Sequence, residues 1–145
     1  MRLTKQSSYA IRALMYCALN DPNLSQVSSI SRSFGISEAF LFKLIKPLVK
    51  NNILTTVRGR NGGIRLARPA SEITVFESIR LTEDNFALAP CFEDGQNDCP
   101  LKDACAFHDV LDAALQAFFD ELNAHTIADL VANEGELRDR LALPA

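Results

Sequence analysis

The most constraining feature of the sequence is a pair of short helical patterns followed by two strand-like segments. Val27, Ile30 and Phe34 repeat at helical spacing, and Gly35 ends this segment where a left-handed backbone is needed. Ser37 then offers an N-cap for a second amphipathic helix, whose apolar stripe is Phe40, Leu41, Leu44, Ile45 and Leu48. Two helices joined by a glycine-containing turn predict a helix-turn-helix.

The strand-like segments that follow predict a β-hairpin. Ile53–Arg58 and Gly63–Ala67 are rich in branched residues, and a glycine-rich basic stretch separates them. Its glycines allow close approach to another backbone, and its arginines suit phosphates or a narrow minor groove. The expected fold class is therefore mainly α with a small β-hairpin, in which a winged helix-turn-helix domain precedes a long C-terminal dimerisation helix.

Helices are also predicted on both sides of this unit. An apolar stripe at helical spacing predicts a first helix from Leu3 to Leu19, and Cys17 lies on that stripe as a small buried hydrophobe. Thr74 and Glu77 form a capping-box pattern for a short helix after the hairpin.

The C-terminal part of the sequence contains the longest amphipathic pattern. Its apolar residues repeat over about four helical turns: Phe107, Val110, Leu111, Ala114, Leu115, Phe118, Phe119 and Leu122. Packing against the rest of the chain is one interpretation, and we favour pairing with a second subunit. Thr126 and Asp129 are expected to cap a final short helix, with a frayed tail beyond Gly135.

Charge divides the chain into two unlike halves. Residues 1–70 hold eleven Lys and Arg against two acids, a net charge of +9, whereas residues 71–145 have a net charge of −12. The basic half coincides with the helix-turn-helix pattern, so we expect it to bind double-stranded DNA. Two solvated faces of opposite sign are the alternative.

Three cysteines lie close together as Cys91-x7-Cys99-x5-Cys105. Reduced thiols gathered this tightly are typical of a soft metal or an iron–sulfur cluster. The spacing lacks the Cys-x2–4-Cys knuckles of zinc modules and the runs of ferredoxins, so it leaves zinc and iron both open. His108, three residues after the last thiol, is a candidate fourth ligand, with a surface or capping histidine as the alternative. The acidic loop Glu93–Asp98 is expected to be solvated.

Several classes of protein find no support in the sequence. No signal peptide or membrane-length apolar run is present, so the chain is expected to be cytoplasmic. No Cys-x-x-Cys, Ser/His/Asp pattern or phosphate loop occurs, so we predict no enzyme, no catalytic residue and no small-molecule substrate.

Four segments together resemble a known family: Met1-Arg-Leu-Thr-Lys5, Phe34-Gly-Ile-Ser37, Thr56-Val-Arg-Gly-Arg-Asn-Gly-Gly63 and the three cysteines. They are similar to the iron–sulfur winged-helix transcriptional repressors, the IscR/NsrR/RirA group, over roughly residues 1–131. The x7/x5 spacing and Cys91-Phe-Glu-Asp94 resemble its RirA-like iron regulators most.

The resemblance implies specific roles for several residues. Cys91, Cys99 and Cys105 match the cluster ligands, and Arg58 matches a wing arginine that enters the minor groove. An aspartate near the partner's N-terminus serves NsrR-like proteins as fourth ligand, but this sequence has Ser7-Ser8 there. His108 matches the histidine of IscR-like proteins, which favours a [2Fe-2S] cluster, whereas the remaining sequence favours [4Fe-4S], the preferred expectation.

The implied function is an iron-responsive repressor that binds a near-palindromic operator as a homodimer. The expected division is a DNA-binding domain at 1–82, a cluster-binding loop at 83–105, and dimerisation and C-terminal helices at 106–145. Alternatives are a nitric oxide or redox sensor, a cluster-assembly regulator, or a zinc-stabilised DNA-binding protein without a switch. The predicted DNA contacts are Arg2, Thr4, Ser37, Glu38, Ala39, Phe42, Lys43, Lys46, Arg58, Gly59, Arg60 and Asn61.

Overall fold

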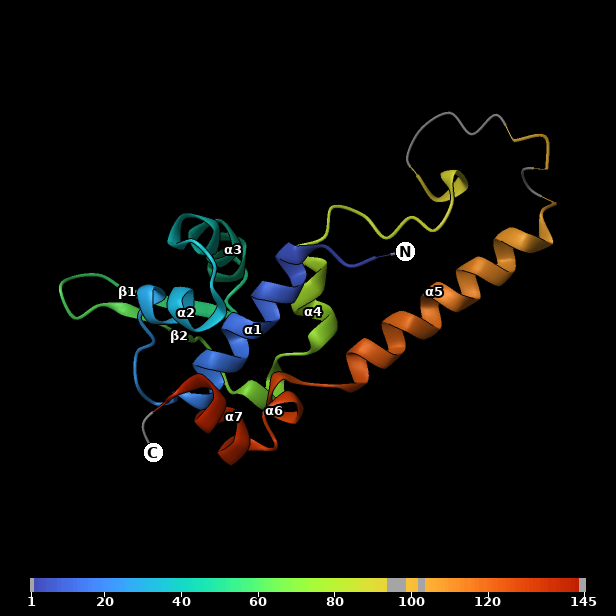
Figure 1. Cartoon of the computed structure of the whole chain (residues 1–145). Helices are drawn as coiled ribbons and strands as arrows, with labels where there is room; N and C mark the ends of the chain where they lie inside the picture. The colour runs from blue at the N-terminus through green and yellow to red at the C-terminus, as the bar shows by residue number, and fades with distance from the viewer. Residues whose placement is uncertain (1, 94–98, 102–103, 144–145) are drawn as a thin grey trace.

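Helices account for most of the regular structure in the computed structural model, which describes residues 2–93, 99–101 and 104–143 (Figure 1). The described elements, in chain order, are α1 (Lys5–Leu19), α2 (Val27–Phe34), α3 (Glu38–Lys50), β1 (Leu54–Val57), β2 (Gly63–Leu66), the 3-10 turn η1 (Ala70–Glu72), α4 (Val75–Arg80), the 3-10 turn η2 (Pro90–Phe92), α5 (Ala106–Ala124), α6 (Ile127–Leu130) and α7 (Glu134–Leu141). The predicted fold class, mainly α with one hairpin, is confirmed.

The helix-turn-helix forms as its turn signals predict. Gly35 ends α2 with φ of 63°, in the left-handed region. Ser37 begins α3, and its hydroxyl accepts a hydrogen bond of 3.2 Å from the Phe40 N–H. The first helix starts two residues later than predicted, at Lys5, because Thr4 serves as its N-cap.

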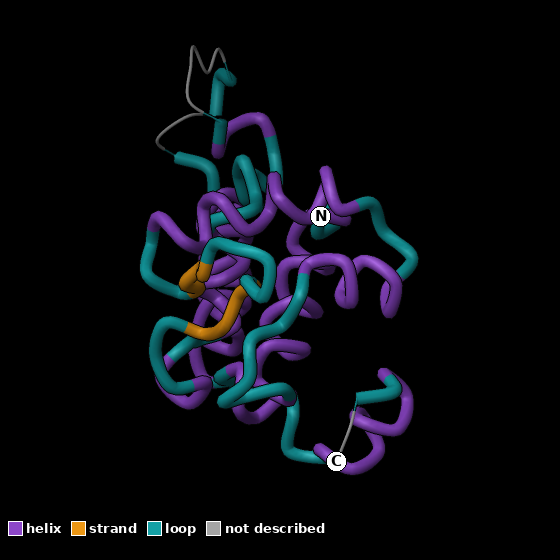
Figure 2. Tube along the Cα trace, turned by 90° about the vertical axis from the view of Figure 1, so that its left-hand side faces the viewer, coloured by secondary structure: helices purple, strands orange, loops and turns teal. Residues whose placement is uncertain are grey.

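The wing is a two-stranded antiparallel hairpin that lies on one side of the body (Figure 2). Val57 pairs with Gly63 at the tip end, and Leu54 pairs with Leu66 at the base. Ile64 also exchanges two backbone hydrogen bonds, of 2.8 and 2.9 Å, with Ser25 before α2. A Cβ on Gly63 would lie 2.7 Å from the Ser25 carbonyl oxygen, so a side chain there would push the two segments apart.

The core forms around α1, which packs against α3, α4, α6 and β2. Ala10, Leu14 and Cys17 are almost fully buried on one face of α1. Burial raises the pKa of the Cys17 thiol to about 12, so this cysteine is a buried hydrophobe, as predicted. Ile127 of α6 completes the core from the C-terminal side.

Helix α5 projects from the body as an arm (Figure 1). Its C-terminal end is anchored by backbone hydrogen bonds of 2.9 Å from Val75 to His125 and from Ile127 to Ile73. Along its 19 residues only Leu115 is buried, although the helix is rich in apolar side chains. Within the described residues, no helix is long and apolar enough to cross a membrane.

The C-terminal segment is more ordered than predicted. Thr126 and Asp129 form the expected capping box at α6. The predicted fraying beyond Gly135 is wrong, because the chain stays helical there to the end of α7 (Glu134–Leu141). Arg138 explains the difference, because its guanidinium donates a hydrogen bond to the Leu19 carbonyl and a second one, of 2.7 Å, to Glu134. The contact with Leu19 holds α7 against the end of α1.

Candidate nucleic-acid interface and cysteine segment

The predicted α3 residues lie on the outward side of that helix. Leu41, Leu44 and Leu48 turn into the core. Helical geometry places the remaining predicted residues within less than half of the helix circumference. All of them are exposed: Glu38, Ala39, Phe42, Lys43 and Lys46. The N-cap Ser37 is exposed at the start of the same surface.

The wing tip presents the other predicted contacts. Arg58, Gly59, Arg60 and Asn61 are all exposed. A hydrogen bond of 2.9 Å from the Gly62 N–H to the Gly59 carbonyl closes the turn. The two arginine side chains thus extend from a short, closed loop, an arrangement suited to reaching a phosphate or a narrow groove.

A groove of about 450 Å³ lies between α3 and the wing and is lined in part by Glu38, Phe42 and Arg58. The first residues of α2 also line it, and sequence reasoning missed them. Gln26 is the N-cap residue of α2, yet its side chain makes no capping hydrogen bond. Together with Ser28 it adds two polar side chains to the groove.

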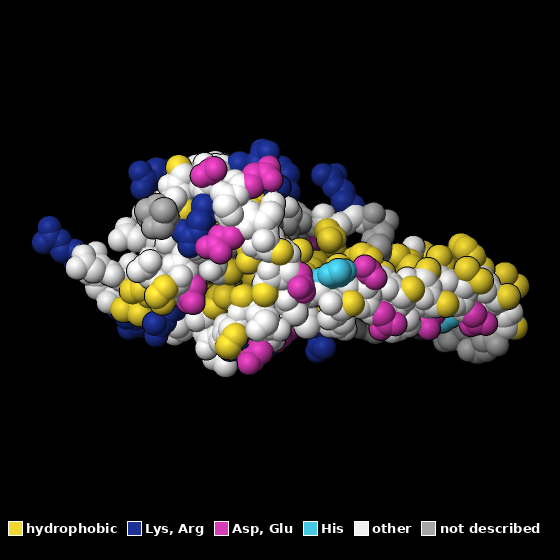
Figure 3. All heavy atoms as spheres, turned by 90° about the horizontal axis from the view of Figure 1, so that it is seen from below, with side chains coloured by type: hydrophobic (Ala, Val, Ile, Leu, Met, Phe, Trp, Pro, Cys, Tyr) yellow, Lys and Arg dark blue, Asp and Glu magenta, His cyan; other side chains and the backbone are white. Residues whose placement is uncertain are grey.

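Basic and apolar side chains gather in different parts of the surface. Hydrophobic side chains line the α5 arm in Figure 3, whereas Lys and Arg lie mainly on the body and at its far end, where Figure 1 places the hairpin. Lys43 and Lys46 are exposed on the outward α3 surface, and Arg58 and Arg60 are exposed at the wing tip. These two surfaces are therefore suited to a polyanion.

The first turn of α1 is held by a polar cluster that sequence spacing did not reveal. Arg2 is exposed, but Thr4 donates from its N–H and its hydroxyl to one oxygen of Glu83, at 2.7 and 3.1 Å. Ser7 donates to the same oxygen and lies 2.7 Å from the Thr82 hydroxyl. We call Thr4, Ser7, Thr82 and Glu83 the α1 cap cluster. A carboxylate at a helix N-terminus is electrostatically favourable.

Further along α1, an aromatic contact reaches α3. The rings of Tyr9 and Phe40 meet edge to face with centroids 6.0 Å apart. The Arg12 guanidinium lies 5.2 Å from the centre of the Tyr9 ring. The start of α1 therefore touches both Glu83, which follows α4, and the first turn of α3.

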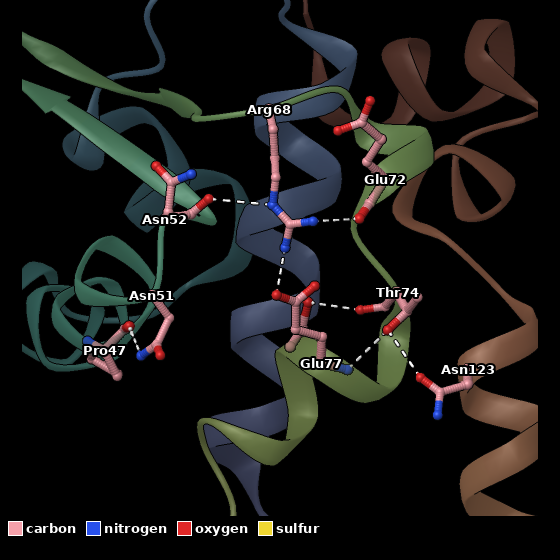
Figure 4. Close-up of polar contacts among 9 residues, drawn as sticks. Pro47, Asn51, Asn52, Arg68, Glu72, Thr74, Glu77 and Asn123 are labelled. Carbon is pink, nitrogen blue, oxygen red and sulfur yellow. Dashed lines mark hydrogen bonds and ion pairs between the residues drawn. The ribbon is translucent and has the colours of Figure 1, made fainter.

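A second set of polar contacts joins the wing to α4 and α5 (Figure 4). Arg68, just after β2, donates to the backbone carbonyls of Asn52 and Glu72 and forms an ion pair with Glu77 of α4. Glu77 is thereby used by Arg68, while its N–H donates to the Thr74 hydroxyl at 3.1 Å. The Thr74 hydroxyl in turn donates to Asn123 of α5. Only the Thr74 half of the predicted Thr74–Glu77 capping box is therefore formed, because the Glu77 carboxylate pairs with Arg68 instead.

The cysteine segment, residues 83–105, connects α4 to the far end of α5 (Figure 1). Cys91 lies in η2, and Cys105 is the N-cap residue of α5. The Phe92 ring stacks on the His108 ring, with centroids 4.7 Å apart and planes 13° apart. This stack brings the turn that carries Cys91 beside the first turn of α5.

The thiols of Cys91, Cys99 and Cys105 are chemically suitable ligands for an iron–sulfur cluster. Cys91 and Cys105 are half-buried and Cys99 is exposed, so none of the three is part of the core, unlike Cys17. Residues 94–98 and 102–103, including most of the acidic loop, lie outside the described residues. Within the part of the chain that is described, no three His, Cys, Asp or Glu side chains are close enough to hold a metal ion. A cluster shared by Cys91, Cys99 and Cys105 would require these three thiols to lie closer together than they do here.

His108 is the fourth-ligand candidate from the sequence, whereas Ser7 and Ser8 stand where NsrR-like proteins use an aspartate. The His108 ring stacks on Phe92, and its Nδ1 lies 3.7 Å from a carboxylate oxygen of Asp109. Ser7 is buried within the α1 cap cluster, and its neighbour Ser8 is exposed.

Comparison with known proteins gives matches over almost the whole chain. The Rrf2 family model, described as an iron-dependent transcriptional regulator, matches residues 3–133. Protein aau3 of Rhizobium meliloti is 53% identical, over 99% of this chain and 93% of that protein. The HTH-type transcriptional regulator NsrR of Oceanobacillus iheyensis is 41% identical, over 94% of each chain.

A solved structure has a fold similar to that of this chain. The structure of IscR from T. potens superposes on this chain with a TM-score of 0.73 and covers 95% of this chain and 91% of its own. At 24% identity, that likeness concerns the fold.

Proposed function

Because this chain belongs to the Rrf2 family of transcriptional regulators, which bind DNA and are not enzymes, we propose that it is a repressor switched by an iron–sulfur cluster. The proposed ligands are Cys91, Cys99 and Cys105. The observation that carries the proposal is the α1 cap cluster. It joins Glu83, where the cysteine segment begins, to α1, and α1 contacts α3.

The proposed DNA contacts come from α3 and the wing. The recognition helix would enter the major groove, with Lys43 and Lys46 on phosphates. Arg58 would read minor-groove shape. The exposure of these side chains and the groove between α3 and the wing support this orientation. The full proposed set is Arg2, Thr4, Ser37, Glu38, Ala39, Phe42, Lys43, Lys46, Arg58, Gly59, Arg60 and Asn61.

The arrangement of side chains around α5 supports a homodimer. Leu111, Leu115, Phe119 and Leu122 face the chain's own α4 side, where Phe119 lies 4.8 Å from Phe76 between ring centroids. By helical geometry the exposed polar side faces away, and it consists of Asp109, Asp112, Gln116 and Asp120.

A third side of α5 is apolar and largely uncovered. Phe107 and Val110 are 67% and 64% exposed, and Ala114 follows them at helical spacing. We assign this side to a second copy of the chain, since exposed apolar stripes of this kind mark interfaces. A twofold dimer would set two α3 helices ~34 Å apart on a near-palindromic operator.

In the proposed switch the cysteine segment has two arrangements. When bound, the cluster would cross-link Cys91, Cys99 and Cys105. Closing the segment would pull on Glu83, and Glu83 would fix the start of α1 through Thr4 and Ser7. The Tyr9–Phe40 contact would pass this position on to α3, so the DNA-competent state is the one with the segment closed.

The finer assignments follow the sequence resemblance. We propose a [4Fe-4S] rather than a [2Fe-2S] cluster and a response to iron, with repression when iron is plentiful. The stack of His108 on Phe92 supports a structural use of that ring ahead of a ligand role. The proposed division remains DNA-binding domain 1–82, cluster-binding loop 83–105, and dimerisation and C-terminal helices 106–145. Nitric oxide or redox sensing and control of cluster assembly are the alternative signals.

The test is anaerobic purification followed by an absorption spectrum, and by iron, sulfide and zinc contents per subunit. Broad visible absorption with about four irons and four sulfides is expected. DNA binding by fluorescence anisotropy, with and without the cluster, should differ roughly 5- to 150-fold. Two irons and two sulfides would instead favour His108 as a ligand. A colourless protein with one zinc would remove the switch and leave a DNA-binding dimer.

A further inference from the structure

Phe42 is the most exposed large apolar side chain in the DNA-reading half, with 56% of its surface accessible. The core does not need it, because Leu41, Leu44, Ile45 and Leu48 already fill the inward side of α3. Among the described residues its ring stacks on no other aromatic ring, in contrast with Phe40, which meets Tyr9. Phe42 therefore contributes neither to the core nor to an aromatic pair.

The surroundings of Phe42 point to DNA as its partner. It lines the groove between α3 and the wing together with Arg58 and Arg60, and Lys43 and Lys46 are exposed on the same helix. A cationic rim around an apolar side chain is complementary to a duplex, which carries phosphates at its edge and bases within. A single exposed aromatic residue is unremarkable elsewhere, but here it stands on the proposed base-reading surface.

The chemistry of the major groove restricts what such a side chain can read. A phenyl ring has no hydrogen-bond donor or acceptor, and the apolar group at the base edges of the major groove is the C5-methyl of thymine. Resting on the proposed function, we infer that Phe42 is a specificity-determining residue that packs on a thymine methyl in each operator half-site. Glu38 lies one turn earlier on the same side of α3 and is also exposed.

The experiment replaces that methyl without changing base pairing. An operator is selected from random duplexes with the cluster-loaded protein or the apo-protein, whichever binds DNA more tightly. Each thymine is then replaced in turn by deoxyuridine, and binding is measured by anisotropy. One thymine per half-site should weaken binding about fourfold when replaced, as expected for the loss of one buried methyl group. The two symmetric replacements together should weaken it roughly fifteenfold.

Three variants assign the effect to Phe42 by double-mutant cycles. Phe42→Ser should bind the thymine and deoxyuridine operators equally, whereas Phe42→Leu should keep most of the discrimination. Glu38→Gln is the matched control, since it should change affinity and keep the methyl effect. Because Phe42 is outside the core, the thermal midpoint of each Phe42 variant should match that of the unchanged protein.

The outcomes separate this inference from the proposed function. Equal binding of thymine and deoxyuridine at every position would overturn the inference and leave DNA binding intact. A methyl effect that persists in Phe42→Ser would also overturn it, by assigning the contact to another residue. If no duplex is selected and neither form binds DNA, the proposed function itself fails.

Discussion

The body and the arm of this molecule differ in how far the chain's own contacts satisfy their side chains. In the body, α1 lies among α3, α4, α6 and β2, and residues such as Leu14, Ile30 and Leu41 are fully buried. On the arm, α5 buries one residue and leaves Phe107 and Val110 mostly exposed. The cysteine segment beside it places three thiols outside the core.

This difference shows which part of the fold is complete within one chain. Apolar burial stabilises the body without a partner. In the proposed function, the arm and the cysteine segment are stabilised by binding, α5 by a second subunit and the thiols by a soft metal centre. On that proposal, the two regions that the chain's own contacts leave incomplete are the regions through which a signal would act.

Removal of any one of the three thiols from the cysteine segment is expected to have the largest effect on cluster content and DNA binding. Single Cys91→Ala, Cys99→Ala and Cys105→Ala variants should lose the visible absorption and weaken operator binding roughly 5- to 150-fold. Cys17→Ala is the control, because Cys17 belongs to the body: it should keep its iron and lose about 1–2 kcal/mol of unfolding free energy. Iron and sulfide contents, with urea unfolding, measure both. Iron retained in all three variants would contradict the ligand assignment.

A charge on the uncovered side of α5 should have the next largest effect. Val110→Asp should weaken dimerisation roughly 10- to 100-fold, because a carboxylate would be buried in an apolar interface. Analytical ultracentrifugation measures this, and far-UV circular dichroism should show an unchanged helix content. Gln116→Asp, which adds the same charge to the polar side of α5, should remain dimeric. Equal dissociation of both variants would place the interface elsewhere.

Weakening the contact between the body and the cysteine segment at Glu83 should have a smaller effect on stability and DNA binding. Glu83→Gln removes a charged acceptor of three hydrogen bonds, so about 1–2 kcal/mol of unfolding free energy should be lost. The affinity difference between cluster-loaded and apo-protein for DNA should also shrink. Asp84→Asn, at the exposed carboxylate next in the chain, is the control and should change neither quantity. A Glu83→Gln variant that loses stability but keeps its full switching ratio would limit the α1 cap cluster to a structural role.

The smallest expected effect lies at the junction of arm and body, in the α6 capping box. Hydrogen bonds from the backbone and hydroxyl of Thr126 hold the pKa of Asp129 below its ordinary value. A depressed pKa stabilises the fold above the unfolded-state value of about 3.9, and that stabilisation is lost as the pH falls through the folded value. Thermal midpoints from pH 7 to 3 should therefore decline less steeply in Asp129→Asn than in the unchanged protein. Parallel curves would contradict this assignment.

The sequence predicted those elements that depend on neighbouring residues. Gly35 ends α2, Ser37 caps α3, and Thr126 with Asp129 caps α6, because each of these contacts spans one helical turn. The same holds for the wing, whose glycine-rich tip joins two short strands. A pattern of local period or spacing is sufficient where the determining contact is local.

Contacts between distant parts of the chain could not be predicted in this way. Thr4 and Glu83 are 79 residues apart, and Arg138 meets Leu19 across 119 residues. From their local sequence pattern, Glu83 and Arg138 would each be an ordinary solvated residue. The helical structure of α7 was therefore not predicted. The spacing of the three cysteines likewise gives a donor set and no geometry. The distances among the three thiols depend on how the chain folds back on itself. Among the described residues, they do not form a metal-binding group.

The contact at Gly63 bears on how such a protein can change over generations. A side chain there would meet the Ser25 carbonyl, so this first position of β2 tolerates almost no substitution. Arg60 and Asn61 are exposed at the tip and free of that constraint. Mutation can therefore alter what the tip touches while the attachment of the hairpin stays fixed. Gene duplicates could acquire new binding preferences at the edge of the operator through the tip alone, and protein engineers could exchange tips between relatives with the same expectation.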